Sequence, residues 1–208
     1  MYKRQAQDVF TVPSALQRYQ RPSLFVQSDA AAIIDQARAI TSGRTATSDQ
    51  VTALNQWVYR TLVKRLTIGI PSAVDILANP VGDCHEHTIL FTALSRSLGL
   101  PTRMVAGLVY QHGRFFYHAW PEVWLGQWLP TDPTLGQLIA DATHVGLIEA
   151  ENENLIALGQ FVGQLRIQVL SVEPVLPVKP VNPLAGSSEQ DSENGPNGLN
   201  GPTGQTNR

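Results

Sequence analysis

The chain has little cysteine, with only Cys84 among its 208 residues. A single cysteine excludes an intrachain disulfide, so the protein is not a disulfide-stabilised scaffold. Its stability must come from an ordinary hydrophobic core, which the 43% hydrophobic content can supply. Cys84 is also the one candidate for thiol chemistry, and the stretch VGDCHEHTIL surrounds it with His, Asp and Glu.

Dense charge and long apolar runs are also absent. Fifteen Lys and Arg residues stand against 17 Asp and Glu, giving a net charge of −2 without a basic segment. Nothing therefore indicates nucleic acid or an anionic membrane as a partner. No apolar run reaches the ~20 residues of a membrane span. We expect no nucleic acid and no membrane span in this chain.

The compartment stays open. Residues 1–25 lack the apolar segment of a signal peptide, which predicts the cytoplasm. The opening MYKRQ, however, matches what a common sequencing-library adapter encodes when read from a GTG start. If that match holds, the natural N-terminus is missing, and a periplasmic or secreted protein is expected instead.

Composition predicts one folded domain. From Ser187 onward the chain is rich in Gly, Asn and Ser, and it has too few apolar residues to offset the entropy of ordering. The preceding EPVLPVKPVNPL is Pro-rich and therefore extended. We expect an N-terminal segment over 1–27, truncated or partly artefactual if adapter-encoded, a domain over 28–174, and a linker with a disordered tail over 175–208.

The first part of the domain has helical patterns. Ser28 precedes a helix that ends near Gly43, Ser48 opens a second helix, and Ser72 caps a short third one. An apolar stripe at helical spacing predicts the core face of the second helix. It consists of Val51, Leu54, Trp57, Val58 and Leu62.

Cys84 begins a fourth predicted helix. Asp83 is a favourable N-cap, Glu86 completes a capping box, and Gly99 ends the helix. The unpaired N–H groups and the positive end of the helix dipole favour the thiolate of a cysteine placed there. After Pro101 the pattern changes to period two.

Strands are predicted over RMVAGLVY, FFYHAWPEVW and WLPTDPT, joined by tight turns, and a last strand GQLRIQVLSV from Gly163 is expected to close the sheet. Helices followed by an antiparallel sheet predict an α+β fold.

A cysteine nucleophile needs a base, and the base needs an acceptor on its other nitrogen. With a three-residue loop that holds its Gly in a left-handed conformation, Trp124 pairs with Trp128. The same register pairs Trp120 with Asp132, so His118 and Asp132 become diagonal neighbours on one face. A two-residue loop would put Asp132 on the opposite face.

The segments GDCHEHTILFTALSRSLGLPTRMVAGLVY and YHAWPEVWLGQWLPTDPT resemble the transglutaminase-like core domain of the papain-like cysteine enzymes, of bacterial type. The marks are a GxC helix start, a helix ending in GLPTR, a strand with HAWPEV and a strand ending in DPT. The resemblance extends from about Ser72 to Thr134, and more loosely over the flanking helices and the last strand. It implies a papain-like α+β fold, with the cysteine helix packed on an antiparallel sheet.

Residue by residue, the resemblance makes Cys84 the nucleophile, His118 the general base and acid, and Asp132 the orienting residue. These are the three that the spacing selects. The implied reaction forms a thioester acyl-enzyme from a peptide or protein amide and passes the acyl group to water or to an amine. We favour water, hence a peptidase or amidase, because the chain shows no second substrate domain and no calcium-type acidic cluster.

Two other functions remain open. A cross-linking transglutaminase would use an amine as the acyl acceptor, and a non-catalytic module of a larger envelope or secreted protein would bind extended peptides in the same cleft.

For Cys84 itself, the alternatives are a buried structural thiol and a zinc ligand. Zinc is disfavoured because only His87 shares a helix face with the cysteine. We expect no metal and no cofactor.

Neighbouring residues have simpler expected roles. Glu86 caps its helix, His85 faces solvent, and Arg103 forms an ion pair with Glu86 or Glu122. The tryptophans at 120, 124 and 128 form an acyl-acceptor groove or pack around the His–Asp pair. The segment DATHVGL, which holds Asp141 and His144, lines the cleft, and His112 is exposed at a hairpin tip.

Overall fold

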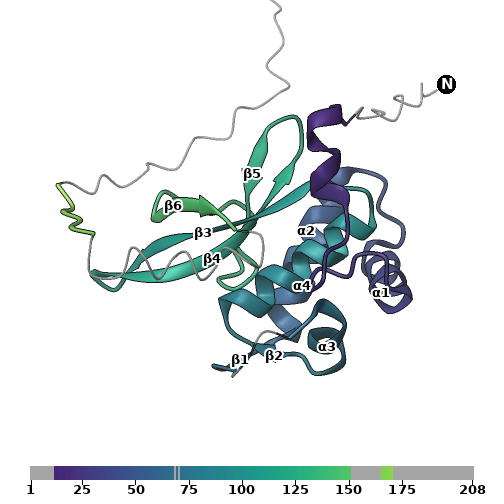
Figure 1. Cartoon of the computed structure of the whole chain (residues 1–208), viewed down its shortest axis with the longest axis horizontal. Helices are drawn as coiled ribbons and strands as arrows, with labels where there is room; N and C mark the ends of the chain where they lie inside the picture. Colours follow the sequence, from purple (N-terminus) through teal and green to yellow (C-terminus); the bar gives the residue numbers. More distant parts are fainter. Residues whose placement is uncertain (1–11, 68, 70, 151–164, 171–208) are drawn as a thin grey trace, which may run out of the picture. The chain divides into compact units, whose positions relative to one another are not determined.

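A computed structural model describes residues 12–67, 69, 71–150 and 165–170 (Figure 1). Helices come first and an antiparallel sheet follows, which confirms the α+β prediction. No helix in these ranges is long and apolar enough to cross a bilayer. The elements are η1 Ser14–Gln20, α1 Ala31–Thr41, α2 Thr47–Thr61, β1 Val63–Lys64, α3 Ala73–Ala78, β2 Val81–Gly82, α4 Cys84–Ser97, β3 Thr102–Gln111, β4 Arg114–Trp124, β5 Trp128–Pro130 and β6 His144–Glu149.

Helix α4 is the centre of the domain. Its residues from Glu86 to Arg96 are all buried. It packs against α1, α2 and α3 and also against β3 and β4 (Figure 1). The predicted stripe of α2 faces this core, with four members fully or nearly fully buried and Trp57 half-buried against them. Cys84 therefore begins the helix that joins the helical layer to the sheet.

The predicted helix starts hold for two helices and fail for two. Helices α3 and α4 begin with capping boxes led by Ser72 and Asp83. The predicted N-caps Ser28 and Ser48 are wrong, because α1 and α2 start after alanines without a side-chain cap. Ser28 is instead buried, with its N–H bonded to the Val26 carbonyl at 2.9 Å.

The main sheet has the order β5-β4-β3-β6, and all of its pairs are antiparallel. The β3–β4 turn has positive φ at His112 and Gly113, as a two-residue hairpin requires, and His112 is exposed as expected. Trp124 pairs with Trp128 across a loop in which Gly126 has φ of 88°, which confirms the three-residue loop.

The strand predicted from Gly163 is wrong where it can be seen, because residues 165–170 form no strand. Strand β6 pairs with β3 instead, through a bulge at Ala106 and Gly107. A Cβ on Gly107 would lie 2.1 Å from the Val145 carbonyl oxygen, so only glycine allows β6 this close. The Pro-rich linker and tail expected over 175–208 lie outside the described residues.

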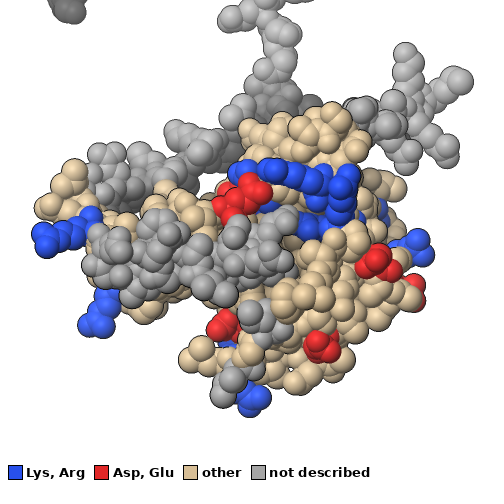
Figure 2. Space-filling model, in the orientation of Figure 1, with Lys and Arg blue, Asp and Glu red and all other residues tan. Residues whose placement is uncertain are grey.

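Charged side chains are dispersed on the face drawn in Figure 2. Lys and Arg lie in separate groups among uncharged residues, and acidic side chains lie beside some of them.

Candidate active site

The start of α4 holds Cys84 in a rigid turn. The Asp83 carboxylate accepts the His85 N–H at 3.0 Å, and Glu86 accepts the Asp83 N–H at 2.8 Å. A Cβ on Gly82 would lie 2.3 Å from the Glu86 Cβ, so the glycine two residues before the cysteine makes room for this cap. Among the described residues, no group accepts the backbone N–H of Cys84.

The Cys84 thiol is half-buried, and its surroundings favour the neutral form. Burial, followed by the negative charge of Asp83, raises its pKa to about 12, and Asp132 and Glu86 act in the same direction. The backbone N–H of Ala119 in β4 opposes them. The thiolate predicted from the helix start therefore needs an additional positive charge nearby.

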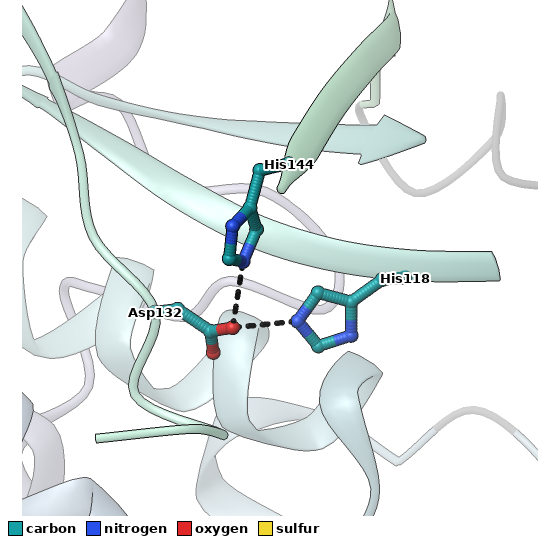
Figure 3. A group of neighbouring side chains, drawn as sticks. All are labelled: His118, Asp132 and His144. Carbon is teal, nitrogen blue, oxygen red and sulfur yellow. Dashed lines mark hydrogen bonds and ion pairs between the residues drawn. The ribbon is translucent and has the colours of Figure 1, made fainter. Parts of the chain in front are cut away.

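His118 and Asp132 form a buried hydrogen-bonded pair. His118 Nε2 lies 2.7 Å from Asp132 Oδ2, and the two side chains are 6% and 0% exposed (Figure 3). A carboxylate accepts only, so Nε2 is the donor, and the neutral ring keeps a lone pair on Nδ1. Burial would raise the pKa of Asp132, but the bonds from His118 and His144 outweigh it and hold the pKa well below its usual range.

The backbone around Asp132 departs from the expected register. Strand β5 ends at Pro130, so the predicted pairing of Trp120 with Asp132 is wrong. Asp132 instead forms an isolated bridge with Gln137, with two bonds of 2.8 and 2.9 Å. Its Oδ1 accepts the N–H groups of Thr134 and Leu135 at 2.7 and 3.1 Å. This local turn aims Oδ2 at the imidazole.

Asn55 of α2 ties this turn to the helical layer, and the sequence analysis missed it. Its amide donates to the Thr131 hydroxyl at 2.6 Å and to the Gln137 carbonyl at 3.1 Å. The residue is 1% exposed. A polar residue beside the apolar stripe, one position after Leu54, was the signal that could have indicated a buried partner.

His144 of β6 is a second imidazole on the same carboxylate. Its Nε2 lies 3.1 Å from Asp132 Oδ2, and its side chain is 3% exposed (Figure 3). Its Nδ1 faces the Asp141 carbonyl at 3.2 Å and the Asp141 carboxylate at 3.3 Å. Although burial lowers the pKa of His144, these oxygens raise it above its usual value. The expected cleft-lining segment thus reaches the Asp132 carboxylate.

One aromatic side chain, Trp120, packs against both imidazoles. Trp120 stacks on His118 with ring centres 6.0 Å apart and meets His144 edge-on at 5.1 Å. Trp124 and Trp128 contact each other edge-on at 5.4 Å. Two roles were expected for these tryptophans. Trp120 has one of them, because it packs against the His118–Asp132 pair.

Of the roles predicted for residues near Cys84 and the sheet, some are confirmed and one is wrong. Arg103 pairs with Glu122 at 2.6 Å, and Glu86 caps its helix as predicted. His85 is half-buried rather than solvent-facing. Within the described part of the chain, no hydrogen bond joins the Cys84 sulfur to His118, so the thiol–imidazole pair stays a prediction.

Comparisons with known proteins agree with this fold. Residues 34–133 match the model of the transglutaminase-like superfamily. Among curated proteins, no match was found. A candidate cysteine protease from Cytophaga hutchinsonii has a similar structure, with a TM-score of 0.61 and 23% identity over 69% of this chain and 49% of its own.

The periplasmic domain of TgpA from Pseudomonas aeruginosa has a TM-score of 0.48 and 20% identity, over 61% of this chain and 49% of its own. The chain spans about half the length of each of these two structures. Residues 34–133, with Cys84 at a helix start and His118 and Asp132 on the sheet side, therefore belong to the transglutaminase-like superfamily.

Proposed function

We propose that this protein is a cysteine hydrolase of peptide or protein amides, with Cys84 as nucleophile, His118 as base and acid, and Asp132 as the orienting carboxylate. The observation that carries this proposal is the 2.7 Å bond from His118 Nε2 to Asp132. It fixes the tautomer in which Nδ1 is the free basic nitrogen, which is the state that a general base requires.

The first step moves the Cys84 proton to His118 Nδ1, and the sulfur attacks the amide carbonyl carbon. Asp132 stabilises the resulting imidazolium, because its low pKa keeps it ionised at neutral pH. The unused N–H of Cys84, at the positive end of α4, is the first donor to the tetrahedral oxyanion. The proton on His118 then passes to the leaving amine, and a thioester remains.

The second step releases the acyl group. Water gives its proton to His118 Nδ1 and attacks the thioester carbonyl, and the sulfur leaves with the returned proton. The products are a carboxylic acid, an amine and the free thiol, and water is the only co-reactant that this reaction consumes. An amine in place of water would produce a cross-link; the relative from Cytophaga, described as a candidate protease, agrees with water.

The proposal is tested by iodoacetamide labelling of Cys84 at pH 7, followed by mass spectrometry. Without the imidazolium, burial and three carboxylates keep the thiol neutral, so His118→Ala should react ~100-fold more slowly than the parent. His112→Ala is the matched control, since His112 is exposed at the hairpin tip.

Equal labelling rates in all three proteins would overturn the assignment of Cys84 as nucleophile. The non-catalytic peptide-binding module would then be the favoured function. Incubation with a peptide mixture and a free primary amine then separates the two reactions. Shortened or deamidated peptides support hydrolysis, whereas amine adducts alone would replace it with cross-linking.

A further inference from the structure

We propose that His118, Asp132 and His144 form a site for a transition-metal ion such as Zn²⁺, and that the bound ion switches off the thiol reaction. The regulatory part of this inference rests on the proposed function, whereas the metal site does not. The cluster is separate from the C-H-E-H stretch, and neither His85 nor Glu86 belongs to it.

The three ligand atoms already converge on one point (Figure 3). His118 Nε2, His144 Nε2 and Asp132 Oδ2 all lie within 4.8 Å of one another, and the two nitrogens are 2.7 and 3.1 Å from the oxygen. Tetrahedral zinc with bonds of ~2.0–2.1 Å holds its ligand atoms roughly 3.3 Å apart. To admit the ion in place of the shared protons, the two nitrogen–oxygen separations would lengthen by roughly 0.6 and 0.2 Å, and the two nitrogens, now within 4.8 Å of each other, would approach to about the same separation.

Outer partners orient two of the three ligands, His144 and Asp132, as they do in known metal sites. The Nδ1 of His144 faces only oxygen acceptors, the carbonyl and carboxylate of Asp141, so its proton stays there and Nε2 can bind the ion. This carboxylate–histidine arrangement is the common second shell of zinc histidines. Asp132 Oδ1 is occupied by two backbone N–H groups, which leaves Oδ2 for the metal.

The donor set favours a transition metal over Mg²⁺ or Ca²⁺. Two imidazole nitrogens and one carboxylate oxygen suit Zn²⁺ or Co²⁺, whereas Mg²⁺ and Ca²⁺ prefer oxygen ligands. Trp120 packs against both imidazole rings. This apolar ring limits solvent access to the ligands, so a bound cation that compensates the negative charge of Asp132 is favoured.

Metal binding at this place would remove the base. An imidazole coordinated through Nε2 keeps its one proton on Nδ1, so His118 would have no lone pair for the Cys84 proton. Asp132 would be bound to the ion and could no longer stabilise an imidazolium. The thiol would return to the neutral form that its buried, acidic surroundings favour.

The test uses Co²⁺ added to the chelator-treated full chain, with visible absorption as a readout independent of activity. We expect about one tetrahedral Co²⁺ per chain. Asp141→Asn, an exposed change, should weaken binding ~10-fold, and His144→Gln should weaken it by more than the ~10–100-fold typical of outer partners. His112→Gln and Cys84→Ser should bind as the parent does. Zn²⁺, but not Mg²⁺, should slow iodoacetamide labelling of the parent and not of His144→Gln.

Parent-like Co²⁺ affinity in both His144→Gln and Asp141→Asn would overturn the site, as would a sulfur-to-cobalt band that disappears in Cys84→Ser. Binding as expected, with a metal-free thiol no more reactive than in His118→Ala, would support the metal site and reject the acyl-transfer function. A reactive thiol that Zn²⁺ does not slow would reject the regulation and leave the function standing.

Discussion

The two halves of the candidate site are held by different kinds of contact. The helix-start half, around Cys84, is fixed mainly by Asp83 and Glu86, its neighbours in sequence, with one longer-range bond from the Thr67 hydroxyl to Glu86. The carboxylate half is fixed by hydrogen bonds that Asp132 accepts from His118 and His144, which lie 14 and 12 residues away and on different strands. The capping box of the first half forms within one helix turn, whereas the second half requires the assembled sheet.

This difference predicts where the site is vulnerable. A local cap loses a single interaction when one partner is changed. The buried carboxylate accepts bonds from two imidazoles and two backbone N–H groups, so its loss leaves several groups without an acceptor. Substitutions should therefore cost more in the carboxylate half than in the helix-start half.

The largest effect is expected for Asp132→Asn. Removing the charge of a fully buried partner should lower the free energy of unfolding by about 3 kcal/mol at pH 7. Because the folded pKa of Asp132 is lowered, its contribution is present above the unfolded value of ~3.9 and is lost as pH falls below it. The difference between parent and variant should shrink toward about pH 3, as measured by urea unfolding.

Asp141→Asn is the matched control, because Asp141 is 51% exposed and its loss should change stability little. A pH-independent difference between Asp132→Asn and the parent would show that the carboxylate charge does not stabilise the fold.

Two glycine substitutions should disturb the two halves of the candidate site independently of each other. Gly107→Ala places a Cβ against the Val145 backbone and should displace β6 with His144, at a cost of about 1–3 kcal/mol. Gly82→Ala meets the Glu86 side chain and should disturb only the α4 cap. Urea unfolding gives the stabilities, and the NMR signals of His144 and His85 report each half. Loss of both signals in one variant would contradict the separation.

The smallest effect is expected for Thr67→Val in the helix-start half. The Thr67 hydroxyl donates to Glu86 at 2.6 Å, and valine keeps the shape without the donor. One lost hydrogen bond should lower the free energy of unfolding by about 1 kcal/mol, as measured by urea unfolding. A loss as large as that of Asp132→Asn would remove the distinction between the halves.

Sequence patterns predicted the α+β order, the α4 cap and the hairpin that carries His118. They failed where distant contacts decided the outcome. The last strand is β6 rather than the segment from Gly163, because Gly107 and a bulge admit β6 beside β3. The Trp120–Asp132 pairing failed because the chain turns toward Gln137 after β5.

By itself, the sequence determined where Cys84 would stand, since the capping residues and the glycine break act within a few residues of it. The spacing also brought His118 and Asp132 to the same region. Only the tertiary structure decided that His144 would share the Asp132 carboxylate, and that Asn55 would hold the turn that carries it. These bonds join elements that meet only after the helices and the sheet have packed together, so no local pattern encodes them.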